Sequence, residues 1–105
     1  MPIVIAGQPF TLAEHKMLAA MIDSLPFTGA VWDVWQEEAA FPEVLGIIPP
    51  RCEGPRWCLK RDSDGRVIVD ALRVGPLGTC DEARAVFDSM GAAVEAVRVE
   101  LIEGR

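Results

Sequence analysis

Residues 56–73 constrain the fold most, because their pattern is that of a β-hairpin. Two runs rich in β-branched and aromatic residues flank the sequence Asp62-Ser63-Asp64-Gly65. Aspartate side chains stabilise tight turns, and glycine tolerates the positive φ angle that hairpin loops require. A three-residue loop with a left-handed Gly65 pairs Asp62 with Arg66. The sequence therefore predicts two adjacent antiparallel strands.

The register of this hairpin divides its side chains between the two faces of a sheet. It places Leu59 opposite Val69 and Trp57 opposite Ala71. The face expected to join the core carries Trp57, Leu59, Val67, Val69 and Ala71. The other face carries Cys58, Lys60, Ile68 and Asp70. A shift of one residue would exchange the two faces, so the register decides which side chains are buried.

Length and composition indicate a single domain spanning residues 1–105, since 50% of the residues are hydrophobic and can form one modest core. The net charge is −6. Residues 1–50 carry six acids and one lysine, whereas residues 51–105 carry ten acids and nine bases. This acidic balance argues against direct binding to the phosphate backbone of nucleic acids. It allows a basic protein partner or a surface that imitates nucleic acid.

The chain carries no pattern of a membrane, secreted or metal-binding protein. Its apolar runs are far shorter than the roughly 20 residues of a membrane-spanning helix. The N-terminal sequence MPIVIAGQPF lacks the basic region of a secretory signal. Cys52, Cys58 and Cys80 follow no familiar disulfide or zinc-ligand spacing, and the chain has one histidine. We therefore expect free thiols, a cytoplasmic location, and no membrane, metal or cofactor.

In the first 40 residues, one strand and two helices are predicted. Residues 2–6 are apolar and β-branched, as in a strand. Thr11 and Glu14 match a capping box, which precedes a helix over residues 12–24. Residues 29–40 begin with the alternation of a strand but continue with strong helix formers. Both structures remain open there, and a helix is the one we predict.

Beyond the hairpin, the patterns predict one more helix and one more strand. Thr79 and Glu82 match a second capping box. The apolar stripe that follows, with helical spacing, is Ala83, Val86, Phe87 and Met90. Residues 96–103 alternate between apolar and charged side chains, which predicts a half-buried strand.

These elements give the order β-α-α-β-β-α-β and an α+β fold. We predict a two-layer sandwich of about four mainly antiparallel strands with the helices on one face. The open face of the sheet would carry Cys58, Lys60, Asp70, Arg98 and Glu100. Such a mixed-charge face suits either a binding surface or an ordinary solvated one.

The chemical inventory is poor for an enzyme, and we predict no catalytic residue. No serine lies in a Gly-x-Ser-x-Gly elbow, and tyrosine is absent from the chain. Nothing in the sequence supplies a nucleophile or carboxylate beside His15. Cys80, in the first turn of a predicted helix, is the thiol that a helix dipole would activate. Glu37 and Glu38 are adjacent, and adjacent helical residues do not face each other.

The residues best suited to binding are Arg51, Arg56 and Trp57, in a segment rich in proline and glycine. Arginine binds a carboxylate or phosphate through a planar fork, and Arg and Trp are enriched at interface hot spots. Prolines lower the entropic cost of presenting them. The alternative is that the arginines pair with the acidic first half while Trp57 faces the core. In the same segment we predict a helical turn at residues 43–45 and an extended run at 47–51.

The leading hypothesis is a small, acidic, non-enzymatic interaction protein of the cytoplasm that binds another protein, as an accessory or inhibitory factor. A second candidate surface is an acidic helical face around Asp33, Glu37 and Glu38, which could also imitate nucleic acid. The alternative class is a small-molecule-binding domain or minor enzyme with a pocket between sheet and helices. Its polar groups would be Cys80, His15, Arg51 and Arg56. A third reading is a homodimer formed through an open strand edge.

Overall fold

A computed structural model of the chain describes residues 7–35, 41–74, 77 and 80–103. Across these ranges, six strands form one antiparallel sheet and two helices complete an α+β domain. The elements are β1 (Gly7–Gln8), α1 (Leu12–Asp23), β2 (Val31–Trp35), β3 (Val44–Ile48), β4 (Trp57–Asp62), β5 (Val67–Val74), β6 (Cys80–Phe87) and α2 (Met90–Glu103). The predicted α+β class is confirmed, whereas the sheet has more strands than the four expected.

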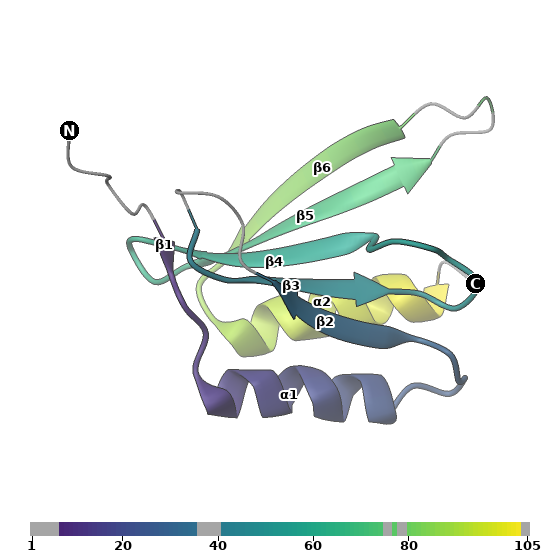
Figure 1. Ribbon diagram of the computed structural model, residues 1–105, viewed down its shortest axis with the longest axis horizontal. Coiled ribbons are helices and arrows are strands. Elements are labelled where there is room, and N and C mark those ends of the chain that lie inside the picture. The colour runs from purple at the N-terminus through teal and green to yellow at the C-terminus, as the bar shows by residue number, and fades with distance from the viewer. Residues whose placement is uncertain (1–6, 36–40, 75–76, 78–79, 104–105) are drawn as a thin grey trace.

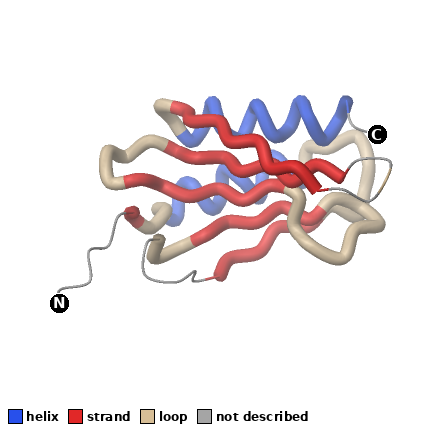
Figure 2. Tube along the Cα trace, turned by 90° about the horizontal axis from the view of Figure 1, so that it is seen from above, coloured by secondary structure: helices blue, strands red, loops and turns tan. Residues whose placement is uncertain are grey.

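The sheet has the order β2-β3-β4-β5-β6, and β1 pairs with the end of β4 that β3 does not reach. Both helices lie on the same side of the sheet, and β5 and β6 rise away from them (Figure 1). The view from above shows the strands in front of the two helices (Figure 2). We call the sheet face toward the helices the inner face and the opposite one the outer face.

The hairpin of β4 and β5 has the predicted register, with Leu59 opposite Val69. The backbone N–H of Asp62 donates to the carbonyl oxygen of Arg66 at 2.9 Å, and Gly65 has a φ of 86°. The face predicted to join the core is the inner face, and its buried members are Leu59, Val67, Val69 and Ala71. The turn chemistry was therefore sufficient to predict both the pairing and the buried face.

The helix predicted over residues 12–24 is confirmed as α1. The hydroxyl of Thr11 accepts a hydrogen bond from the backbone N–H of Glu14 at 3.2 Å. The Glu14 carboxylate accepts one in return from the N–H of Thr11 at 2.9 Å, which completes the capping box. The helix ends before the C-cap Ser24 and buries Leu18 and Met21.

The core lies between the inner face and the two helices. The helices contribute Leu18, Met21, Met90, Ala93, Val94, Val97 and Leu101. The strands contribute Leu45, Ile47, Leu59, Val67 and Val69. Burial of apolar surface on this scale, at roughly 25 cal/mol per Å², is what holds both helices to the sheet.

The predicted helix over residues 29–40 is wrong where the structure describes it, because Val31–Trp35 is strand β2. The strand pairs along its whole length with β3. β-Branched and aromatic side chains dominate these five residues, and they favour a pleated surface. Strand pairing thus decides the conformation of residues 31–35. Residues 36–40 of the predicted helix lie outside the described residues.

The predicted helix after Thr79 is also wrong, because Cys80–Phe87 is strand β6 and pairs with β5 at every position. The spacing of the apolar residues in this segment fits both the helical period and the strand period. Ala83, Ala85 and Phe87 alternate on the inner face, opposite Ala71, Val69 and Val67. The long neighbour β5 offers a complete ladder of hydrogen bonds, so the strand period prevails. Thr79 itself lies outside the described residues.

The predicted strand at residues 96–103 is wrong, because these residues belong to α2. Val97 and Leu101 are four residues apart, so their spacing suits one face of a helix as well as alternation. Ser89 precedes the helix and caps it, since its hydroxyl accepts a hydrogen bond from the N–H of Ala92 at 3.2 Å. Gly91 lies within the first turn of this helix.

These corrections change the order of elements to β-α-β-β-β-β-β-α. The helical turn predicted at residues 43–45 is wrong as well, since Val44–Ile48 is strand β3. The extended run predicted at residues 47–51 is confirmed for residues 47–48 and wrong for residues 50–51, which form a turn. The strand predicted at residues 2–6 lies outside the described residues. Among the described residues, no helix combines the length and apolar character needed to cross a membrane.

Candidate functional site

A cleft of about 690 Å³ opens where β3 ends and β4 begins. Its walls come from the segment after α1, the turn after β3, the starts and ends of neighbouring strands, and the last turns of α2. The lining residues are Phe27, Thr28, Pro49, Pro50, Arg51, Cys52, Arg56, Trp57, Leu72, Glu100 and Leu101. The structure therefore brings Arg51, Arg56 and Trp57, the three residues favoured from the sequence, into one cleft.

A tight turn presents Arg51 at this cleft. The carbonyl oxygen of Pro49 accepts a hydrogen bond from the N–H of Cys52 at 3.3 Å, and Arg51 has a φ of 67°. Proline at the second position and a positive φ at the third are typical of a type II turn. A left-handed conformation costs a non-glycine residue roughly 1–2 kcal/mol, and such strain concentrates at functional sites. The Arg51 side chain is exposed.

The sheet holds Arg56 and Trp57 more rigidly. The N–H of Arg56 donates to the carbonyl oxygen of Ile47 at 2.9 Å, and its own carbonyl oxygen accepts from Leu72 at 2.7 Å. The indole Nε1–H of Trp57 donates to a carboxylate oxygen of Glu100, which joins β4 to α2. Both Arg56 and Trp57 are half-buried. Trp57 thus packs partly against the core and still contributes to the wall of the cleft.

The cleft carries positive charge in an acidic protein. Four other arginines pair with carboxylates, namely Arg61, Arg66, Arg84 and Arg98. By contrast, neither Arg51 nor Arg56 forms an ion pair with any residue in the described part of the chain. Glu100 is the acid among the lining residues, and the Trp57 indole engages it. Two guanidinium groups beside apolar walls suit a carboxylate or a similar anion.

The second predicted surface is not assembled in the described residues. Asp33 lies on β2 opposite Gly46 and is exposed, and its carboxylate accepts a hydrogen bond from the N–H of Val34 at 2.8 Å. Glu37 and Glu38 lie outside the described residues. Since residues 31–35 form a strand, the helical face on which the three acids were expected to share a surface is wrong.

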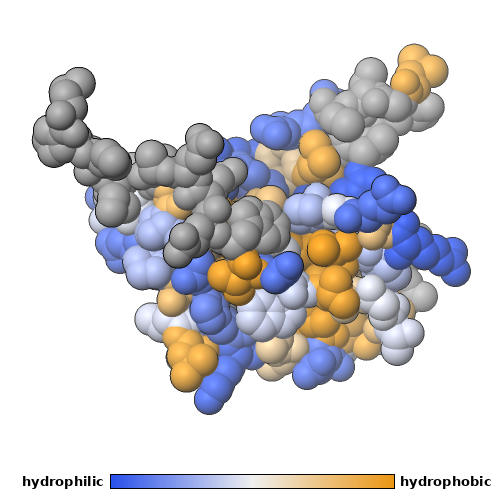
Figure 3. Space-filling model, in the orientation of Figure 1, coloured by the Kyte–Doolittle hydropathy of each residue, from blue (hydrophilic) through white to orange (hydrophobic). Residues whose placement is uncertain are grey.

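The outer face of the sheet carries a row of alternating charges. The guanidinium of Arg84 donates two hydrogen bonds to the Asp70 carboxylate, at 2.7 and 3.0 Å, and Lys60 lies 3.5 Å from the same carboxylate. These contacts lower the pKa of Asp70, and the hydrogen bond from Arg84 has the largest effect. Partial burial of the carboxylate opposes the shift. Figure 3 shows apolar side chains near the centre of the view, bordered by hydrophilic ones.

The sequence correctly placed Cys58, Lys60 and Asp70 together on this outer face, as the hairpin register shows. It wrongly added Arg98 and Glu100, which belong to α2 on the other side of the sheet. Because residues 96–103 were predicted as a strand, Glu100 was not expected to line the cleft. The helical stripe of buried residues from Met90 to Leu101 was the signal that would have located it.

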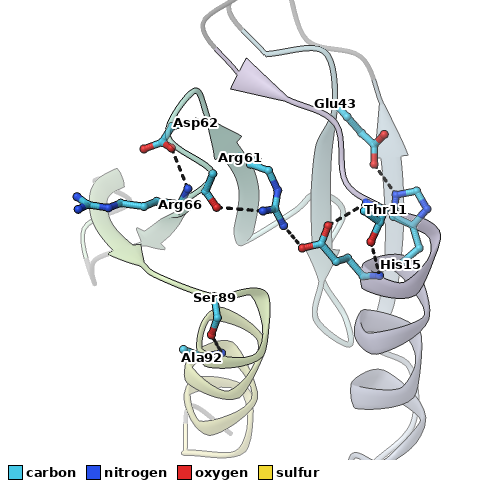
Figure 4. A network of polar contacts seen from close by, with 10 residues as sticks. Thr11, His15, Glu43, Arg61, Asp62, Arg66, Ser89 and Ala92 are labelled. Atoms are coloured by element: carbon cyan, nitrogen blue, oxygen red, sulfur yellow. Dashed lines mark hydrogen bonds and ion pairs between the residues drawn. The ribbon is translucent and has the colours of Figure 1, made fainter.

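His15 has a carboxylate partner that sequence reasoning missed. Its Nε2 contacts a carboxylate oxygen of Glu43, and its ring lies 5.9 Å from that of Trp32. Nearby, Arg61 bridges the Glu14 carboxylate and the carbonyl oxygen of Gly65 (Figure 4). Glu43 precedes β3, whereas the cleft lies beyond the other end of that strand. These contacts fasten α1 to the sheet and are separate from the cleft.

Neither metal ligands nor a reactive thiol cluster emerges from the ranges that the structure covers. There, no three His, Cys, Asp or Glu side chains are placed to hold a metal ion. Neither Cys52 nor Cys58 is part of a disulfide among the described residues, and the side chain of Cys80 lies outside the description. Of the polar groups expected in a small-molecule pocket, Arg51 and Arg56 line the cleft, whereas His15 does not.

No protein-family model, curated protein or solved structure matches this chain. The fold and the site define it as a small α+β domain with an arginine-lined cleft at one end of its sheet. Any assignment of function therefore depends on the chemistry of the cleft itself.

Proposed function

We propose that this chain is a non-enzymatic interaction domain whose cleft binds a carboxylate-bearing segment of another protein. The observation that carries the proposal is the meeting of Arg51, Arg56 and Trp57 in one cleft. Arginine and tryptophan dominate the energetics of protein interfaces. The turn and the strand ladder hold these residues before any partner arrives, so less conformational entropy is lost on binding.

The charges favour an acidic ligand that is recognised locally. A net charge of −6 repels an acidic chain at long range, so general attraction cannot account for its binding. Close to the cleft, two guanidinium forks supply charge-assisted hydrogen bonds. Phe27 and Pro50, both half-buried, supply apolar contacts for the partner's side chains. By occupying such a segment, the domain would act as an accessory or inhibitory factor.

The odd number of cysteines, without a familiar disulfide spacing, supports a reducing compartment such as the cytoplasm as the place of this interaction. Nucleic-acid mimicry by the acidic surface has weaker support, since Asp33 is the one member of its predicted trio within the described residues.

A second candidate function is the binding of a small carboxylate-bearing molecule. The cleft volume of about 690 Å³ is within the range of roughly 300–1,000 Å³ typical of small-molecule sites. Thermal unfolding with added succinate or citrate separates the two functions. A small ligand that binds the folded state raises the melting temperature as its concentration rises, whereas a protein segment needs contacts beyond the cleft.

The proposal is tested by affinity capture from nuclease-treated lysate with three immobilised forms: wild type, Arg51→Ala/Arg56→Ala and Arg66→Ala/Arg98→Ala. Each double variant loses two positive charges, but Arg66 and Arg98 form only surface ion pairs, with Asp88 and Glu95. We expect a stoichiometric protein to be captured by the wild type and the control and lost with the cleft variant. Capture that the cleft variant retains, or that both variants lose equally, would contradict the proposal.

A further inference from the structure

Strand β6 ends the sheet, and in the described residues nothing pairs with its outer edge. It is eight residues long, and residues 81–86 are all exposed. Figure 1 and Figure 2 both show it as the outermost strand on the side away from β2. A long open edge presents unpaired N–H and C=O groups and is a template for a further strand.

Backbone hydrogen bonds decide which residues of β6 point to this edge. The hydrogen bonds from Asp62 to Arg66 and from Leu72 to Arg56 show that even-numbered residues of β5 bond toward β4. In an antiparallel sheet, the backbone N–H and C=O groups of successive residues point to opposite sides of the strand. The backbone groups of the odd-numbered residues of β5 therefore bond to those of their partners in β6. The residues of β6 that present both backbone groups outward are therefore Cys80, Glu82, Arg84 and Val86.

We propose that two copies of this chain join through β6 as an antiparallel pair, with Glu82 of each copy opposite Arg84 of the other. Near the middle of the strand, the residues whose backbone groups point to the open edge can pair symmetrically in three registers. One places Glu82 opposite itself and another places Arg84 opposite itself. Like charges directly opposite are destabilising, and opposite charges stabilise by roughly 0.2–1 kcal/mol per pair. Charge therefore selects the third register, which is centred on Ala83.

The neighbouring strands prepare the charges for this register. Arg84 is held by the Asp70 carboxylate on β5, and Lys60 on β4 contacts the same carboxylate. Glu82 of the second copy would extend this row of alternating charges across the joined outer face. Each copy supplies both members of the pair, so the complementary surface is a second copy of this chain.

The inner side of the edge leaves room for a second copy. Ala83 and Ala85 face the side of α2 but are exposed, unlike the other inner-face residues opposite them on β5. A small groove of about 100 Å³ runs between them and Ala96 of α2. Small side chains at these positions allow the helix of a second copy to approach. The cleft contains no residue of β6, so the dimer would leave it open.

The test is the molar mass measured by sedimentation over a range of concentrations, for which a dimer has twice the 11.4 kDa of one chain. Glu82→Arg places arginine opposite Arg84, and we expect it to weaken the dimer at least about tenfold. Glu103→Arg makes the same charge change at the exposed end of α2 and should leave the dimer unchanged. A wild type that stays monomeric, or a dimer that Glu82→Arg does not weaken, would overturn the proposal.

Two further measurements fix the register. Mixing Glu82→Arg with Arg84→Glu restores two opposite-charge pairs. The mixture should therefore form a heterodimer, whereas each variant alone should form its homodimer only weakly. Because Arg84→Glu also loses the Asp70 contact, a second test avoids that residue. Ala83→Cys lies on the symmetry axis and should form a disulfide between copies under oxidation, whereas Ala85→Cys should not. Equal cross-linking of the two cysteine variants would overturn this register.

Discussion

Trp57 and Glu100 meet beside the cleft, where the indole Nε1–H of Trp57 donates a hydrogen bond to the Glu100 carboxylate. The two residues are 43 positions apart and belong to β4 and α2. Their contact fixes the last turns of the helix against the start of the strand. The guanidinium groups of Arg51 and Arg56 line the same cleft, together with this carboxylate.

Replacing Trp57 by phenylalanine should therefore destabilise the fold by more than the loss of ring area alone. Hydrogen bonds to charged groups contribute about 1.5–3 kcal/mol. Trp32→Phe is the matched control, because Trp32 is also half-buried but has no hydrogen bond of its indole recorded among the described residues. In urea denaturation we expect Trp57→Phe to lower the free energy of unfolding by about 1.5 kcal/mol more than the control. Equal losses would show that the indole contact contributes little.

The ion pair of Arg61 and Glu14 gives a second prediction (Figure 4). Both side chains are mostly buried, with 17% and 14% of their surface exposed. Glu14→Gln can keep the capping box but leaves the Arg61 charge without its partner, which should cost about 3 kcal/mol of folding free energy. Adding Arg61→Met should recover part of that loss, because no buried charge then remains. Asp23→Asn, at the exposed end of α1, should change stability by less than about 0.5 kcal/mol.

Gly65 should tolerate substitution poorly. Its φ of 86° belongs to the left-handed region, although no atom would lie within 4 Å of an added Cβ. Gly65→Ala should thus cost roughly 1 kcal/mol through backbone strain alone. Gly54 has the same open surroundings without a positive φ, so Gly54→Ala is the control and should be near neutral. A Gly65→Ala protein as stable as this control would contradict the left-handed turn.

The contact of Asp70 with Arg84 predicts a pH dependence of stability. Its hydrogen bond lowers the pKa of Asp70 below the ordinary value of 3.8. The unfolded state therefore binds the proton more readily, so this contact stabilises the fold above about pH 3.8 and is lost as the pH falls toward the lowered pKa. Below about pH 4, unfolding free energy should fall more steeply for the wild type than for Asp70→Asn. Parallel curves would mean that Asp70 contributes no such linkage.

Local chemistry predicted one part of the fold well. The turn around Gly65 set the register from Leu59 to Val69, and the Thr11–Glu14 capping box located α1. Both signals act within a few residues and need no knowledge of the rest of the chain. The proposed binding residues Arg51, Arg56 and Trp57 were selected by residue type, and the structure places them in one cleft.

Strands β2 and β6 and helix α2 were mispredicted for a common reason. In each, apolar spacing suits both the helical and the strand period, and the choice depends on the element that the segment pairs with or packs against. β2 is decided by pairing with β3, and β6 by pairing with β5. The walls that Phe27, Leu72 and Glu100 add to the cleft come from segments far apart in sequence, so only the assembled fold reveals them.

The most direct test of the proposed function is an NMR titration of the ¹⁵N-labelled chain with a polyglutamate peptide as the acidic probe. We predict shift changes at the backbone amides of Arg51, Cys52 and Arg56 and at the indole N–H of Trp57. These changes should disappear in Arg51→Ala/Arg56→Ala and persist in Arg66→Ala/Arg98→Ala. Shifts that spare the cleft, or that both double variants lose equally, would contradict the claim that this cleft binds carboxylate-bearing segments.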